Sequence, residues 1–216
     1  WSIDLQTDLY SVYMFRGQNL FDGTSIQPSV VAGYDFGDMG AIGGYAWSHL
    51  SADEQISSED RFTEFDYSLY YSIGLDIVSL EAGLIWYTYP RSRDEIEDTA
   101  EFYAKIALDM ILSPSFTYFR DYDALDADYY QLGVSQEIET NLVGDGFKFT
   151  PYLTFGFASN AEAIYDNNGL EAITIGATFE TSLGDIGVVP SVHYNFKIDD
   201  YTNNQFWFGV TFKYGV

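Results

Sequence analysis

The stretch that decides the fold is FKFTPYLTFGF at residues 147–157, in which apolar and polar side chains alternate strictly. One face carries Phe147, Phe149, Pro151, Leu153, Phe155 and Phe157, and the other carries Lys148, Thr150, Tyr152, Thr154 and Gly156. A period of two over so many residues predicts a long β-strand whose two faces meet different environments. The segment QFWFGVTFKYGV at residues 205–216 repeats the pattern, and helical spacing never occurs with comparable strength.

The same alternation along the whole chain predicts about twelve strands in a single domain, residues 1–216. The expected spans are 2–16, 24–36, 40–49, 61–74, 77–89, 99–110, 112–120, 128–140, 147–158, 169–182, 186–196 and 204–215. Roughly 60% strand is far more than an ordinary globular domain contains, whereas a closed membrane barrel requires it. The expected fold class is therefore all-β, a transmembrane antiparallel up-and-down β-barrel.

The predicted connections alternate in length, which supports that fold. After the even-numbered strands they are tight, at residues 37–40, 75–76, 111, 141–146 and 183–185. After the odd-numbered strands they are longer and carry much of the acid, at residues 17–23, 50–60, 90–98, 121–127, 159–168 and 197–203. Short turns at one end and long loops at the other are typical of bacterial outer-membrane barrels, with both termini on the periplasmic side. Because the chain begins at Trp1 rather than Met, we expect a mature product without its targeting segment.

Composition excludes several function classes. The 216 residues include 33 acidic and 9 basic side chains, for a formal net charge of -24, which repels phosphate backbones and argues against nucleic-acid binding. The chain has no cysteine, which excludes disulfides, thiolate catalysis and cysteine-ligated metals. No stretch approaches 18 uninterrupted apolar residues, so no membrane-spanning helix is expected.

The side-chain chemistry of the two faces favours lipid outside and water inside. The polar faces consist mostly of Gly, Ser, Thr, Gln and Tyr, and aromatic residues gather near strand ends, as in Tyr34, Phe36, Trp86, Tyr194 and Phe196. Such clusters match the aromatic girdles at membrane interfaces. We therefore expect outer-membrane lipid and lipopolysaccharide as partners. A soluble β-sandwich with an aromatic core remains an alternative.

Three segments resemble those of a known family. The segment Tyr13-Met14-Phe15-Arg16-Gly17, followed by Asp22-Gly23, is similar to the opening of that family's sequences. That opening has an aromatic residue, then Arg-Gly, and then Asp-Gly a few residues later. Residues 80–90, LEAGLIWYTYP, resemble a strand ending in Tyr-x-Tyr-Pro, and Glu101-Phe102-Tyr103-Ala104 resembles the start of the next strand. The family is the TorF family of porin-like bacterial outer-membrane proteins, whose function is poorly defined. The resemblance covers residues 8–110, with extra residues between Gly23 and Pro28, and implies a pore without supplying a substrate or catalytic residues.

The predicted inward faces carry charges of both signs, with acids in excess. The residues expected to line a pore are Arg16, Gln27, Glu64, Asp66, Glu81, Lys105, Gln131, Lys148 and His193. An acid-biased lumen favours passive passage of small cations. Alternatively the charges pair and fill a closed structural barrel whose outer loops bind another cell-surface component. Twelve strands lie between the filled eight-stranded barrel and the open sixteen-stranded one, so both interpretations stay open, as does association with a second copy.

Enzymatic and metal-binding interpretations are weaker, and we expect no catalytic residue, cofactor or metal site. Ser191, His193 and Asn195 share one predicted strand face, but no Gly-x-Ser-x-Gly elbow accompanies them. His49 lies near acidic loop residues at the predicted rim, where an Asp–His site is the alternative. The acidic run 121–128 lacks the glycine and closing glutamate of an EF-hand loop. A solvated loop is the plain interpretation, and weak Ca²⁺ or Mg²⁺ binding at the acidic loops is the alternative.

Overall fold

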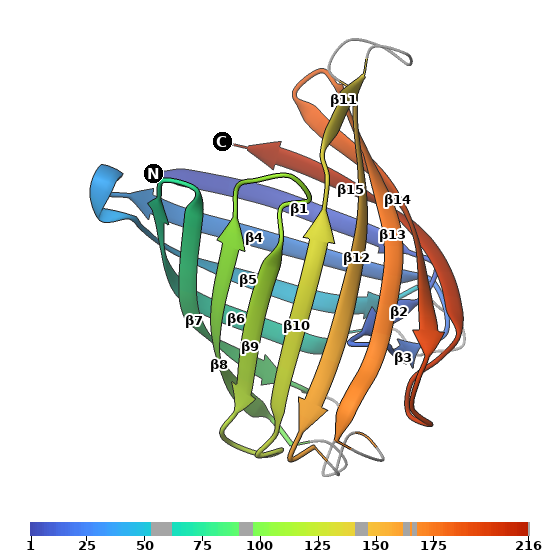
Figure 1. Cartoon of the computed structure of the whole chain (residues 1–216). Helices are drawn as coiled ribbons and strands as arrows, with labels where there is room; N and C mark the ends of the chain where they lie inside the picture. The colour runs from blue at the N-terminus through green and yellow to red at the C-terminus, as the bar shows by residue number, and fades with distance from the viewer. Residues whose placement is uncertain (53–61, 91–96, 141–146, 162–164, 166–167, 216) are drawn as a thin grey trace.

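The computed structural model describes residues 1–52, 62–90, 97–140, 147–161, 165 and 168–215. Twelve antiparallel strands form one closed barrel, in which each strand pairs with its neighbours along the chain (Figure 1). Pairing of β10 with β12 closes the ring, and pairing of β1 with β15 joins the two ends of the chain. The barrel strands are β1 (Ser2–Tyr10), β4 (Ser25–Asp35), β5 (Ala41–Ser51), β6 (Phe62–Leu75), β7 (Val78–Thr88), β8 (Thr99–Leu108), β9 (Ser115–Asp121), β10 (Asp128–Ser135), β12 (Phe147–Ser159), β13 (Gly169–Leu183), β14 (Ile186–Lys197) and β15 (Gln205–Gly215).

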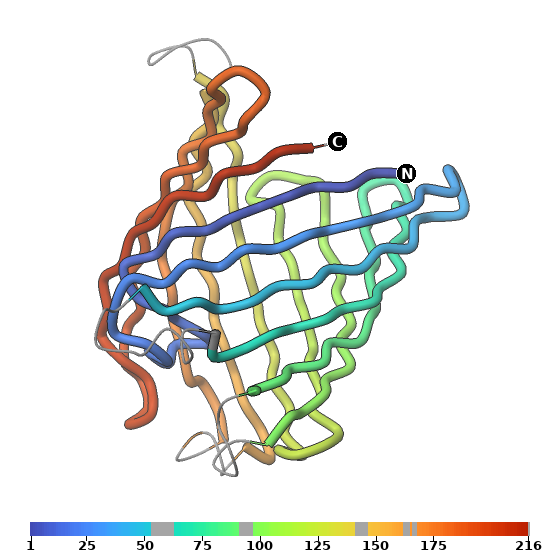
Figure 2. Tube along the Cα trace, turned by 180° about the vertical axis from the view of Figure 1, so that it is seen from behind, coloured from blue at the N-terminus to red at the C-terminus, as the bar shows by residue number. Residues whose placement is uncertain are grey.

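Short turns and long loops occupy opposite ends of this barrel, as the alternation predicted. Both termini lie at the short-turn end, close to each other (Figure 2). The β6–β7 turn is tight because Asp76 adopts a φ of 56°, and the β13–β14 turn is tight because Gly184 adopts 62°. A short 3₁₀ helix, Gly37–Met39, forms the β4–β5 connection. No helix long and apolar enough to cross a membrane occurs among the described residues.

One strand predicted as continuous is interrupted, and Pro151 explains the interruption. The expected span 128–140 is divided into β10 and β11 (Ile138–Thr140), with Gln136 opposite Pro151 on β12. The Gln136 N–H donates to the Pro151 carbonyl at 3.2 Å, but proline has no N–H to return the second bond of the pair. The β8–β9 connection is also longer than the single residue predicted, because β9 begins only at Ser115.

The distribution of exposed side chains is the reverse of that in a water-soluble barrel. Large apolar side chains are exposed on the outer surface, as with Phe206 and Phe208 at 57% and Leu69 at 51%. The most deeply buried side chains are polar, as with Asn195 at 0%, His49 at 1% and Glu171 at 1%. A soluble β-sandwich would bury the aromatic residues and expose the polar ones. The transmembrane interpretation of the alternating pattern is therefore confirmed.

Candidate functional site in the barrel lumen

The first long connection folds into the barrel and carries Arg16 to the lumen side of β8, β9 and β10. Strand β1 ends at Tyr10, and β2 (Tyr13–Phe15) and β3 (Gln18–Phe21) then form a small sheet of their own. We call residues 13–21 the inner hairpin. It contacts β8 through Arg16 and β14 through Gly17, two strands that lie nearly opposite each other in the ring. The predicted strand 2–16 is wrong at its end, because the aromatic residues that prolong the alternation pack inside the lumen rather than in the wall.

The turn of the inner hairpin explains why Arg16 lies at its tip. Phe15 pairs with Gln18, which leaves a two-residue loop of Arg16 and Gly17 with φ values of 48° and 87°. Positive φ at both positions is the type I′ geometry that matches the twist of a hairpin. A Cβ atom at position 17 would lie 2.7 Å from the Cβ of Ala172 on β13. Gly17 therefore allows both the turn and its close approach to the wall.

The Arg16 guanidinium is bound on the barrel wall by one carboxylate and several aromatic rings. Nη1 and Nη2 donate to the two oxygens of Glu101 at 2.7 and 2.8 Å, a bidentate arrangement. Cζ lies 4.4 Å from the ring centroid of Phe119 and 4.5 Å from that of Tyr129. The Tyr87 hydroxyl donates to Glu101 at 2.8 Å and orients its carboxylate. We call these residues, together with Phe15 at 4.7 Å, the Arg16 site.

Electrostatics keep this guanidinium charged. Burial acts to lower the pKa of Arg16, but the carboxylate of Glu101 raises it, and the net pKa is above the ordinary value. The exposed fractions of the two side chains are 12% for Arg16 and 6% for Glu101, so solvent screens the pair weakly. The Arg16 site is thus a buried ion pair with hydrogen bonds and ring faces around it.

Two further anchors hold the inner hairpin across the lumen. On one side the Tyr13 hydroxyl donates to Glu64 on β6 at 2.9 Å, and the Tyr13 ring stacks on His49 with centroids 4.7 Å apart. On the other side Asn195 Nδ2 donates to the Gly17 carbonyl at 3.3 Å. The hairpin is therefore tied to three sectors of the wall.

Cavities remain on both sides of the inner hairpin. Toward the long loops lies a cavity of ≈ 270 Å³, lined by Glu101, Tyr129, Tyr165, Leu125 and the tip of the hairpin. Toward the short turns lies a cavity of ≈ 590 Å³, whose lining includes Asp35, Asp38, Glu81 and Lys105. The hairpin thus forms part of the lining of the first cavity, whereas no hairpin residue lines the second.

Residues predicted to line a pore lie on the face that contacts the inner hairpin or in the hairpin itself. Glu64 and Asp66 follow each other on this face of β6, Glu81 lies opposite Lys105, and Gln131 lies opposite Thr117. Near the short turns, Lys148 forms an ion pair with Glu137 at 3.1 Å. Such pairing is what the interpretation as a closed barrel filled by paired charges requires. Gln27 donates to Ser25 at 2.9 Å. Whether these residues line a conducting path stays a prediction.

The two histidines lie inside the barrel, where aromatic rings cover them. His193 Nδ1 lies 2.5 Å from the Tyr152 hydroxyl, and its ring stacks on Trp207 at 4.8 Å. Asn195 next to it binds the inner hairpin and accepts from Thr174 at 2.8 Å, so the set of Ser191, His193 and Asn195 is not arranged as a triad. His49 lies two residues before the long-loop end of β5, where it is 1% exposed beneath Tyr13.

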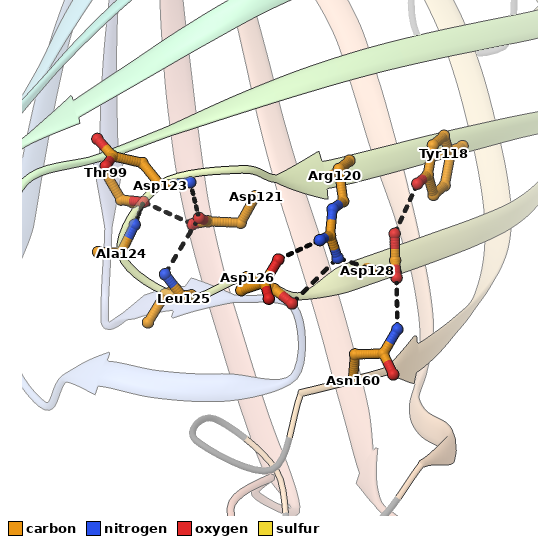
Figure 3. A network of polar contacts seen from close by, with 10 residues as sticks. All are labelled: Thr99, Tyr118, Arg120, Asp121, Asp123, Ala124, Leu125, Asp126, Asp128 and Asn160. Carbon is orange, nitrogen blue, oxygen red and sulfur yellow. Dashed lines mark hydrogen bonds and ion pairs between the residues drawn. The ribbon is translucent and has the colours of Figure 1, made fainter.

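The acidic run 121–128 forms an ordered turn between β9 and β10 (Figure 3). The carboxylate of Asp121 accepts from the Thr99 hydroxyl at 2.7 Å and from the N–H groups of Asp123 and Leu125 at 3.0 and 3.1 Å. These bonds replace the backbone partners that a tight turn lacks.

A second group of contacts surrounds Asp128 in the same turn. It accepts from the Tyr118 hydroxyl at 2.6 Å, from Asn160 at 2.9 Å and from Arg120 at 3.2 Å, and Arg120 also binds Asp126. In the described part of the chain, no three His, Asp or Glu side chains are grouped to hold a metal ion. The acidic positions 53, 54, 59, 60, 94 and 95 lie outside the described residues, and divalent-ion binding stays a prediction.

Several residues of the site were absent from the sequence prediction. Glu101, Tyr87 and Phe119 lie on wall strands without any local feature that marks them as partners of Arg16. The usable signal was the Arg-Gly pair at positions 16 and 17, because glycine after a short apolar run favours a hairpin turn.

No protein-family model and no curated protein sequence matches the chain. Solved structures do match. LpxR from Salmonella typhimurium has a TM-score of 0.58 at 9% identity and covers 99% of this chain and 99% of its own. The NanC porin has a TM-score of 0.57 at 10% identity, with 98% and 97% covered, and the KdgM porin has 0.57 at 10%, with 99% and 98% covered. At such identities the likeness concerns the fold alone: the chain has the architecture of the twelve-stranded outer-membrane β-barrels, one that porins share.

Proposed function

We propose that this protein is a bacterial outer-membrane channel for passive passage of small solutes, with a preference for cations. The observation that carries the proposal is the cavity of ≈ 590 Å³ at the short-turn end of the lumen, whose lining includes Asp35, Asp38, Glu81 and Lys105. Charged side chains around a cavity of this size are costly to bury unless water solvates them. This lining therefore favours a hydrated lumen over a sealed one.

Charge supplies the preference for cations. The carboxylate of Glu101 is neutralised by Arg16, whereas Glu64 and Asp66 lie side by side on β6 without a basic partner among the described residues. A cation or a proton relieves the repulsion between two adjacent carboxylates. Low-dielectric barrel walls focus this field along the lumen, where it attracts cations and repels anions.

We also propose that this protein belongs to the TorF family, because the three segments that resemble that family meet at one place in the structure. Arg16 belongs to the first segment, Tyr87 to the second and Glu101 to the third. All three join in the Arg16 site, where Arg16 and Tyr87 both donate to the carboxylate of Glu101. Three separate segments of a family pattern that converge on one site are better explained by a shared lumen structure than by chance.

A second candidate function is a closed structural barrel whose outer loops bind another cell-surface component. The anchoring of the inner hairpin to β6, β8 and β14 favours it, because a hairpin held on three sides obstructs the lumen. Conductance decides between the two candidates.

Planar-bilayer recordings of the purified protein in a salt gradient are expected to show cation preference. The double variant Glu64→Gln, Asp66→Asn should reduce the ratio of cation to anion permeability by roughly two- to fivefold, because it removes two adjacent, weakly screened carboxyl groups from the lumen wall. The matched variant Asp123→Asn, Asp126→Asn removes two exposed charges from the β9–β10 turn and should change the ratio less. The preference should weaken as salt rises. Absence of conductance in a verified folded sample would favour the closed barrel, and anion preference would contradict the charge argument.

A further inference from the structure

The Arg16 site has the composition of a ligand-binding site whose ligand is part of the chain. Glu101, Tyr87, Phe119 and Tyr129 all belong to consecutive wall strands, β7 to β10. The guanidinium that they surround comes from the inner hairpin, which belongs to a separate sheet. The wall strands therefore supply every group that contacts the guanidinium except the ring of Phe15, which belongs to the hairpin.

The outer cavity gives access to this site. Its ≈ 270 Å³ extend from Glu101 and Tyr129 to Tyr165, whose hydroxyl donates to the Arg16 carbonyl at 3.2 Å. The rest of its lining includes the apolar Leu20, Leu125 and Ala161 and two further carboxylates, those of Asp121 and Asp128, so acids outnumber bases in this cavity. A small solute in this cavity lies beside the bond between Arg16 and Glu101.

We infer that the wall part of the Arg16 site binds guanidinium-bearing organic cations, with Arg16 as the chain's own competitor for the same position. The planar guanidinium group of Arg16 donates to both oxygens of Glu101, and its Cζ lies over the rings of Phe119 and Tyr129. An alkylammonium ion has neither the fork nor the flat faces, so the site selects guanidinium over ammonium. The acid excess of the chain enriches cations near its mouth. That such cations are also transported rests on the proposed function.

Chemical rescue of the variant Arg16→Ala tests the inference. We expect millimolar methylguanidinium to raise the thermal unfolding midpoint of this variant in detergent by a few degrees, and methylammonium at the same ionic strength to raise it less. In the unmodified protein Arg16 competes for the same position, so the difference between the responses to the two ions should be smaller than in Arg16→Ala. The matched control is Lys197→Ala, which removes an exposed lysine paired with Asp200, neither of which lines this cavity. Its response should not distinguish the two ions.

Two results would overturn the inference. One is an equal response of Arg16→Ala to both ions. The other is an undiminished methylguanidinium response in the double variant Arg16→Ala, Glu101→Gln, since binding would then occur elsewhere. If Arg16→Ala does not fold, the same comparison applies to Arg16→Met, which also vacates the cation position but keeps more of the side-chain volume. The readout needs no conductance, so a sealed barrel that binds methylguanidinium would refute the proposed function alone, and a conducting barrel that fails to bind it would refute this inference alone.

Discussion

The variant Glu101→Gln is expected to lower the free energy of unfolding by about 3–5 kcal/mol, because it removes one partner of a buried ion pair. Glutamine keeps the shape of the side chain but leaves Arg16 charged at a position where its side chain is 12% exposed. It also deprives the Tyr87 hydroxyl of a charged acceptor. Denaturant titration of the protein folded into lipid vesicles measures the loss.

The double variant Arg16→Met, Glu101→Gln shows whether the pair is responsible for that loss. Removing both charges leaves no uncompensated ion, so most of the stability should return. The control is Glu139→Gln, whose side chain is 73% exposed beside Lys148 and should cost less than about 0.5 kcal/mol. A loss below about 1 kcal/mol for Glu101→Gln would contradict the view that this pair holds the inner hairpin.

The variant Val210→Arg is expected to cost about 2–4 kcal/mol, because it places a charge in lipid near the middle of β15. Val210 pairs with Leu9 and Pro190 on the outer face, and Phe208 next to it on that face is 57% exposed. The effect should be measured as the loss of unfolding free energy in vesicles. Gln205→Arg, at the end of the same strand on the lumen face, serves as the control and should cost close to nothing. Undiminished folding of Val210→Arg into bilayers would contradict the assignment of this face to lipid.

The sequence by itself determined the barrel and the orientation of its faces. Alternation at 147–157 and 205–216 corresponds to β12 and β15, whose observed bounds differ from the prediction by one residue at most. The alternation of short and long connections was likewise readable, since turn residues act locally. Such patterns are reliable because each strand must satisfy lipid on one side and a polar lumen on the other, whatever its neighbours are.

Only the tertiary structure decided how the lumen is filled. Residues 11–16 continue the alternation of β1, yet they leave the wall, because Tyr13 and Phe15 find aromatic partners inside the barrel. Arg16 and Glu101 are 85 positions apart, and Gly17 and Asn195 are 178 apart. A period-two pattern predicts the face of the strand on which a side chain lies. It does not predict which distant residue that side chain contacts across the lumen. Closure of the ring brings these positions together, so the ion pair between Arg16 and Glu101 could be recognised only once β8, β14 and the inner hairpin were placed in space.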